Sequence, residues 1–372
     1  MTVTPHQLDL YTADVLDLYR ALESDIFEQI CKRLKAPSNV NILEWQLEKM
    51  AQLKMINNFT IKKVAALTNK SEEEIKQIFR DVDTDAIKSV DDELKEVFDP
   101  KPVPTDLDRI IGAYASQTFL DLNNFVNQTL ITTNYGTGSV SIMYQQIINE
   151  TTAKVITGIK TFDQALEETI VKFADKGINS AFVDKGGHTW SMERYVATVI
   201  RSTLNRSYNE LRTGRMGEYG VYTVIMSTLM DSAKRCRGCQ GKILDMRPPA
   251  EAVSGYPSIY MYGYGSASGT LGANCRHSVI TFIPGVSTNN QPKYETKEMQ
   301  QRYKMRERQR ELERRIRKTK KNVMICEELG SEKLDHYKKL LRTQQAQMRD
   351  LFKQPYTDHL RRNYKREKVY TT

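Results

Sequence analysis

Apolar side chains recur at helical spacing along the first hundred residues. A stripe that repeats every four positions ends before Pro37 and places its members on one face of an α-helix. Similar stripes follow within 42–53 and 61–67, and Ser71 with Glu74 forms a capping-box pattern that predicts a second helix start and a helical hairpin over 61–79. We therefore expect an N-terminal helical domain at 1–98. The first stripe comprises Leu18, Leu22, Ile26, Ile30 and Leu34.

A proline-containing connector separates this region from a second helical region. Residues 99–106 contain Pro100, Pro102 and Pro104, which cannot continue a helix and which stiffen an extended linker. Beyond it, residues 107–220 again show mostly helical spacing, interrupted by glycine-containing turns. We expect a middle helical bundle there.

The pattern changes after Gly220. Val221–Ser227 and His277–Ile283 are rich in β-branched residues, and a stretch rich in Gly, Ser and Tyr lies between them. This predicts a small strand-containing module at 221–286, followed by a basic helical tail at 287–372. The expected fold class is α+β and mostly α, with helical N-terminal and middle regions, a small Cys/His module and a long basic C-terminal helix.

The composition excludes several classes of protein. The 372 residues are 40% hydrophobic and 27% charged, which is typical of globular chains. No run of eighteen apolar residues occurs, and the N-terminus lacks a basic stretch followed by an apolar one, so we expect neither a membrane span nor a signal peptide. Five cysteines are too few for a disulfide framework and fit synthesis in a reducing cytoplasm.

Basic charge is concentrated in the tail. Residues 301–372 hold 22 Lys and Arg against 10 Asp and Glu, whereas residues 1–300 are slightly acidic. A cluster of eleven cations within 302–321 suits contact with phosphates of packaged DNA. A heptad seam of apolar side chains runs from Met305 to Cys326 and is interrupted by Gln309 and Thr319. Such a seam suits packing on another helix, and we favour this packing over a contact with DNA. The eleven cations are Arg302, Lys304, Arg306, Arg308, Arg310, Arg314, Arg315, Arg317, Lys318, Lys320 and Lys321.

Four residues of the module form a candidate structural zinc site. Cys236 and Cys239 make a Cys-x-x-Cys pair, and Cys275 and His277 would share one face of an extended segment. Two interpretations remain open: a tetrahedral zinc site, or buried reduced thiols beside a hydrogen-bonded histidine. A redox pair is disfavoured because no thioredoxin-like strand, turn and helix surrounds it. No complete catalytic set is recognisable, so we expect that the protein is not an enzyme.

Two blocks of the module carry a specific pattern: the first contains Gln240 and Gly241, and the second contains Asn274, Cys275, Arg276, His277, Pro284 and Gly285. At these blocks the chain resembles the family called phage minor capsid protein 2, which is similar to the Mu F-like head-morphogenesis proteins. Most of the chain shares the resemblance, including the arginine-rich helix. In that family a His often stands at the position of Cys236 and a bulky apolar residue at that of Cys239, whereas Mu F-like relatives have a Cys-x-x-Cys nearby.

The resemblance implies a minor structural protein of a bacteriophage head. Such a protein would be made in the host bacterial cytoplasm, reside in the virion, and contact portal and head-shell proteins at the portal vertex during head morphogenesis. A nucleic-acid-binding packaging or ejection factor is one alternative. A Mu F-type toxin or effector enzyme is another, disfavoured because such a fusion would add a separate catalytic domain.

Overall fold

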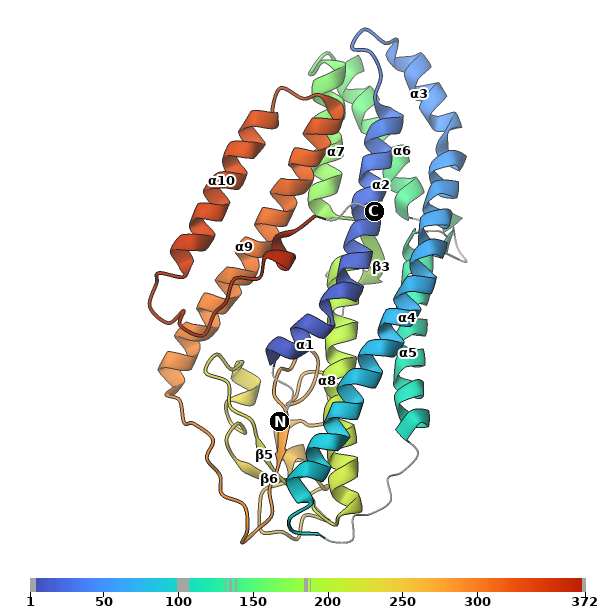
Figure 1. The fold of residues 1–372 in the computed structure, drawn as a ribbon. Coiled ribbons are helices and arrows are strands. Elements are labelled where there is room, and N and C mark those ends of the chain that lie inside the picture. The colour runs from blue at the N-terminus through green and yellow to red at the C-terminus, as the bar shows by residue number, and fades with distance from the viewer. Residues whose placement is uncertain are drawn as a thin grey trace.

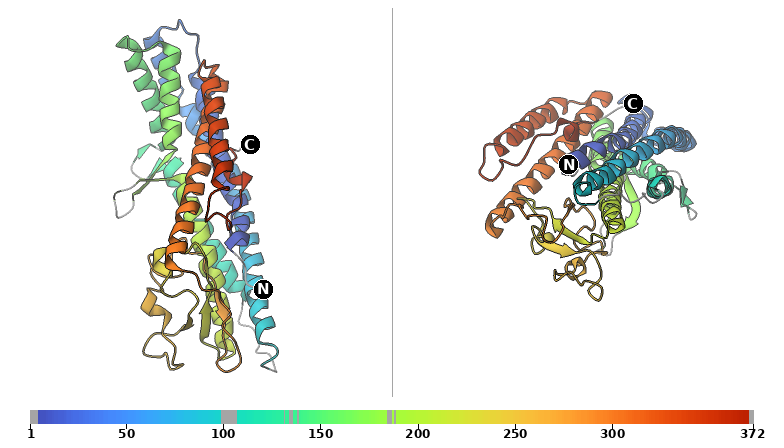
Figure 2. Two further views of the ribbon diagram at one scale, coloured as in Figure 1. Left: turned by 90° about the vertical axis from the view of Figure 1, so that its left-hand side faces the viewer. Right: turned by 60° about the horizontal axis from the view of Figure 1, so that its bottom comes forward.

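The protein is an elongated bundle whose long helices run along one axis, with a small module at one end (Figure 1; Figure 2). The computed structural model describes residues 5–98, 107–130, 132, 133, 136, 137, 139–183, 187 and 189–369. Within these residues the fold is mostly helical with a small three-stranded sheet, which confirms the predicted α+β, mostly α class. None of the described helices combines the length and apolar character needed to cross a membrane. The predicted linker at 99–106 lies outside the described residues.

The N-terminal region begins with one short and three longer helices. Asn41 starts the third of them, because its Oδ1 accepts the backbone N–H groups of Leu43 and Glu44. Trp45 is buried in the first turns and donates Nε1–H to the Leu34 carbonyl at 3.1 Å, which fixes the turn between the second and third helices. The helices are α1 (Pro5–Tyr11), α2 (Ala13–Leu34), α3 (Ile42–Ala51) and α4 (Leu53–Leu94).

The predicted hairpin over 61–79 is wrong, because α4 runs through this segment without a break. Ser71 is buried in the helix interior, where its hydroxyl donates to the Thr68 carbonyl at 3.0 Å and caps nothing. The buried side chains of Leu67 and Ile75 lie on the same helical face to either side of it. Continuous apolar packing therefore outweighs the local capping pattern.

Four further long helices complete the bundle. The largest buried cluster contains side chains from α2, α4 and all four of these helices, and Ile325 of the tail joins it. The predicted regions 1–98 and 107–220 thus contribute to one hydrophobic core. Two short antiparallel hairpins, β1–β2 and β3–β4, interrupt the second region. These elements are α5 (Leu107–Leu130), β1 (Thr132–Thr133), β2 (Gly136–Thr137), α6 (Ser139–Ile156), α7 (Phe162–Lys176), β3 (Asn179–Val183), β4 (Thr189–Ser191) and α8 (Met192–Glu218).

The module is built on a sheet of order β6-β5-β7, in which both pairs are antiparallel. Its core also includes Val90 and Leu94 of α4 and Met216 of α8, so the module is packed against the ends of two bundle helices. The two predicted strands are present, and a third, β6, was not predicted. The elements are β5 (Thr223–Met226), η1 (Lys234–Cys236), β6 (Ile243–Asp245), η2 (Ile259–Tyr262) and β7 (Val279–Thr281).

The tail forms a helical hairpin alongside the bundle. The predicted long basic helix is α9 (Thr296–Leu329), and Gly330 ends it with a φ of 70°, a left-handed conformation that glycine adopts readily. The chain then reverses into α10 (Leu334–Leu351), which packs on α9 through a small apolar cluster (Figure 1). The last described segment, with η3 (Tyr364–Glu367), returns along α9.

Candidate metal centre and the basic helix

The structure brings three of the four predicted zinc ligands together. Cys236 ends η1, whereas Cys275 and His277 immediately precede β7. Helix α8 holds this second segment in place, because Asn209 accepts the Val279 backbone N–H at 3.0 Å and the Arg212 guanidinium donates to the Val279 carbonyl at 3.1 Å.

The distances within this Cys/His cluster suit a tetrahedral metal ion. Cys236 Sγ lies 3.9 Å from Cys275 Sγ, which lies 3.5 Å from His277 Nδ1. Ligands of tetrahedral zinc at ordinary bond lengths are about 3.6–3.8 Å apart. All three residues are buried, and their ligand atoms lie within 4.8 Å of one another. The Cys/His cluster therefore has the donor atoms and spacing to hold a metal ion.

The two sulfurs of the cluster differ in protonation. A hydrogen bond from Cys236, together with contact to His277, lowers the pKa of the Cys275 thiol to about 4. The same hydrogen bond to Cys275, reinforced by burial, raises the pKa of Cys236. A lowered pKa favours the thiolate, which is the form of cysteine that binds a metal ion.

Cys239, the fourth predicted ligand, is outside this group among the residues described. Its sulfur donates to the Cys236 carbonyl at 3.3 Å and lies 3.2 Å from the Thr270 hydroxyl. The Thr270 hydroxyl is in turn 3.9 Å from Cys236 Sγ. Burial raises the pKa of Cys239. It is thus a protonated thiol bonded beside the cluster.

The remaining residues of the two family blocks shape the loops around the cluster. Gln240 Oε1 lies 3.0 Å from His277 Nε2. Gly241 has a φ of 72°, and a Cβ there would stand 3.0 Å from Thr228 Cγ2, so the turn favours glycine. Asn274 adopts a φ of 55° and donates its backbone N–H to Ser202 of α8 at 3.0 Å. Pro284 and Gly285 form the turn that follows β7.

Arg276 lies between the candidate ligands Cys275 and His277 in the sequence, and its partner Asp231 connects the module to the tail. Its guanidinium lies 2.5 Å from Asp231 Oδ1, and Asp231 also pairs with Arg306 of α9 and lies 3.4 Å from His359 Nε2. Asp231 is only 4% exposed. Burial acts to raise its pKa, but hydrogen bonds from His359 and Arg306 lower it overall. Sequence reasoning missed Asp231, because nothing local to it indicates three partners from distant segments.

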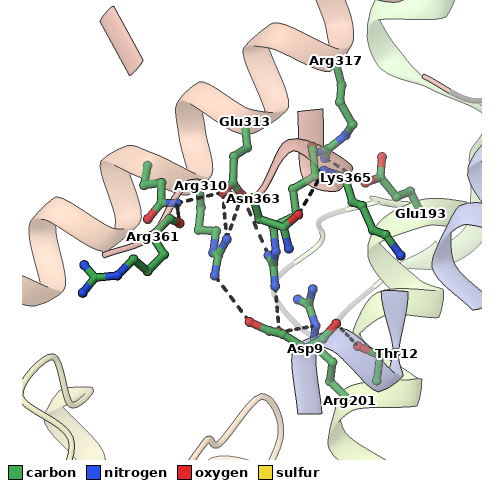
Figure 3. Close-up of polar contacts among 12 residues, drawn as sticks. Asp9, Thr12, Glu193, Arg201, Arg310, Glu313, Arg317, Arg361, Asn363 and Lys365 are labelled. Atoms are coloured by element: carbon green, nitrogen blue, oxygen red, sulfur yellow. Dashed lines mark hydrogen bonds and ion pairs between the residues drawn. The ribbon is translucent and has the colours of Figure 1, made fainter. Parts of the chain in front are cut away.

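Six of the eleven predicted phosphate-binding cations make ion pairs within the chain. Figure 3 shows the densest part: Arg310 lies 3.6 Å from Asp9 of α1 and 2.9 Å from Glu313, and Arg317 lies 2.7 Å from Glu193 of α8. Arg201 of α8 also contacts Asp9 (Figure 3). Arg366 pairs with the same carboxylate at 2.7 Å. These pairs attach α9 to the bundle. The six cations are Arg302, Arg306, Arg310, Arg317, Lys318 and Lys321.

The other five cations have no acidic partner within ion-pair distance among the described residues. Four of them are exposed, whereas Lys320 is half-buried and burial lowers its pKa. The exposed four are Lys304, Arg308, Arg314 and Arg315.

Next to Lys304, the surface carries a depression of about 600 Å³ between the module and the start of α9. We call it the basic depression. Lys234 and Arg237, which also lack an acidic partner among the residues described, line it together with Lys304. The full lining is Lys234, Arg237, Thr296, Gln300, Tyr303 and Lys304.

Fold and site together define an elongated helical protein with a small Cys/His module and an ion-paired basic tail. The family model of phage minor capsid protein 2 matches residues 3–353, and the chain belongs to that family. A structural protein of Lactococcus phage LL-H is 31% identical over 96% of this chain and 99% of its own length. A structural protein of Lactococcus phage mv4 is 36% identical over 31% of this chain and 92% of its own length. No solved structure matches the chain.

Proposed function

We propose that the protein is a non-enzymatic structural component of the virion head, assembled in the host cytoplasm and placed at the portal vertex. There it takes part in head morphogenesis by contacting portal and head-shell proteins. The observation that carries this proposal is the family match over residues 3–353, with a relative of nearly equal length named a structural protein. The burial of the Cys/His cluster supports a structural use, because substrate cannot reach a metal ion that is enclosed by the protein.

The apolar side chains at one end of the bundle support contacts with other proteins. We define the distal end as Leu43 and Leu47 of α3 with Ile156 and Ile159 at the end of α6. These side chains are 55–73% exposed, and α3 packs on α6, where Gln46 bonds Asn149 at 3.1 Å. In Figure 1 these elements lie at the opposite end of the bundle from the module. Apolar groups grouped in this way are typical of interaction surfaces.

Binding to purified portal protein tests the distal end directly. The double variant Leu47→Ser with Ile159→Ser should fold normally, because both side chains are exposed, but should lose comigration with portal protein in size-exclusion chromatography. Val253→Ser with Met261→Ser, which changes two exposed apolar residues of the module, is the matched control and should comigrate like wild type. Equal comigration of both variants would exclude the distal end as the portal contact.

We further propose that the Cys/His cluster holds one structural zinc ion. The spacing of Cys236, Cys275 and His277 and the burial of all three side chains support this assignment. Bound zinc should stabilise the module, since its ligands come from segments about forty positions apart along the chain. Elemental analysis of protein purified without chelators should find close to one zinc per chain, and absence of any transition metal would refute the assignment.

Contact with packaged DNA is a second candidate function, and the unpaired cations favour it. Lys234→Gln, Arg237→Gln and Lys304→Gln together should weaken DNA binding and lower the slope of log affinity against log salt by up to about three. The same change at Lys54, Lys62 and Lys70, three exposed lysines of α4, is the control for net charge. No DNA binding by wild type at low salt, or equal slopes for both variants, would argue against a DNA contact here.

A further inference from the structure

Gln240 is a polar neighbour of the Cys/His cluster and lies on the side of His277 away from the sulfurs. Its Oε1 accepts the backbone N–H of Leu229 at 3.2 Å and lies 3.0 Å from His277 Nε2. A backbone N–H can only donate, so the amide atom facing Leu229 is the oxygen. The same oxygen therefore faces the histidine.

An oxygen acceptor at this place determines which nitrogen of His277 carries the hydrogen. In the zinc-bound protein the imidazole is neutral and has only one N–H, so a ring that donates from Nε2 to the Gln240 oxygen keeps the Nδ1 lone pair for the metal. Nδ1 is the nitrogen that lies 3.5 Å from Cys275 Sγ. We infer that Gln240 is a positioning residue that holds His277 in the tautomer able to bind zinc through Nδ1. This inference rests on the zinc site proposed above.

Gln240 is itself held in one orientation. Its Nε2 approaches Met299 Sδ of α9 at 2.9 Å, while Leu229 holds its oxygen. Ser232 Oγ also approaches His277 Nε2, but at 3.4 Å. The closer Gln240 oxygen is thus the main acceptor. Groups that bond the outer nitrogen of a metal-binding histidine commonly contribute 10- to 100-fold to metal affinity.

Zinc affinity of the full chain, measured by chelator competition, tests this role. Gln240→Leu removes the acceptor and should weaken zinc binding by about 10- to 100-fold. Gln240→Glu keeps an oxygen acceptor and should bind zinc at least about as tightly as wild type. Gln291→Leu is the matched control, because Gln291 bonds Thr228 in the same module without contacting the cluster, and its affinity should stay at the wild-type value.

Nitrogen-15 NMR of the zinc-bound wild type gives an independent readout that does not depend on any variant folding. We expect a hydrogen on His277 Nε2 and a metal-bound Nδ1. A zinc-bound wild type with the opposite tautomer, or an unchanged affinity in Gln240→Leu, would overturn the role of Gln240 and leave the zinc site intact. A wild type that binds no zinc would overturn both.

Discussion

Two buried carboxylates ionise differently because they have different neighbours. Asp231 lies among Arg276, Arg306 and His359, and its pKa is lowered. Asp83 of α4 is fully buried against α8, where the Ser207 hydroxyl bonds it at 2.7 Å, and burial raises its pKa to about 7. Burial without a cation disfavours the charged form.

Asp83→Asn should therefore stabilise the protein more at pH 8 than at pH 5. The folded state binds the Asp83 proton more tightly than the unfolded state, so its carboxylate lowers stability as pH rises from about 4 to about 7. At pH 8 the free energy of unfolding of Asp83→Asn should exceed that of wild type by at most about 4 kcal/mol. Urea unfolding of both proteins at the two pH values measures it, and a gain that does not depend on pH would contradict a buried, protonated Asp83.

Cys239→Ser should retain zinc, whereas Cys236→Ser should lose it. The Cys239 sulfur is bonded to Thr270 and the Cys236 carbonyl, outside the group of three ligands. A serine hydroxyl can make similar bonds, so the module should keep its melting temperature in the first variant. Metal content and thermal melting of both variants check this, and loss of zinc from Cys239→Ser would show that Cys239 is a ligand.

Helix α9 is attached to the bundle through charged side chains as well as apolar ones. Glu193, in the first turn of α8, contacts Arg20 of α2 at 2.9 Å. It also contacts Arg317 of α9 at 2.7 Å (Figure 3). Burial acts to raise the pKa of Glu193, but Arg317 and Arg20 outweigh it and lower the pKa to about 2. One carboxylate thereby connects three helices.

Glu193→Gln should destabilise the protein at pH 7 by up to roughly 3 kcal/mol. The pKa of Glu193 is lower in the folded state, so its contribution is complete above about pH 4.5 and is lost as pH falls toward 2. The difference in unfolding free energy between wild type and variant should thus shrink on acidification. A difference that stays constant from pH 7 to pH 3 would show that the ion pairs contribute nothing.

The sequence predicted the helices well where an apolar stripe was long and uninterrupted. It failed at Ser71, because a capping pattern is local, whereas the continuation of α4 depends on packing against other helices. It also missed β6, in which Ile243 is the one β-branched residue, so the segment lacks the composition that marked β5 and β7. Short elements of this kind are defined by their partners in the sheet, which the sequence does not display.

The candidate site was predictable in part for similar reasons. Cys275 and His277 come together because residues two apart share a face of extended backbone, and that follows from spacing alone. The bond from Cys239 to Thr270 depends on a loop more than thirty positions away. The pairing of Arg317 with Glu193 spans 124 positions, so charge density alone overstated the cations free to bind phosphate.

The tail is part of the folded body of the whole molecule. Ile325 of α9 belongs to the main hydrophobic cluster, and Arg306 and Arg317 pair with carboxylates of the module and of α8. Deleting 301–372 would remove these contacts, so charge-changing variants test a DNA contact more cleanly than truncation. The molecule is elongated (Figure 2), and the exposed apolar side chains of the distal end lie opposite the module.

Quantitative mass spectrometry of gradient-purified phage particles tests the central claim most directly. If the protein is a minor structural component at the portal vertex, its peptides should be recovered from mature particles at a few to a few dozen copies per particle. Absence from the particles, with abundant protein in the infected cytoplasm, would contradict a virion role and favour an assembly factor or an enzyme.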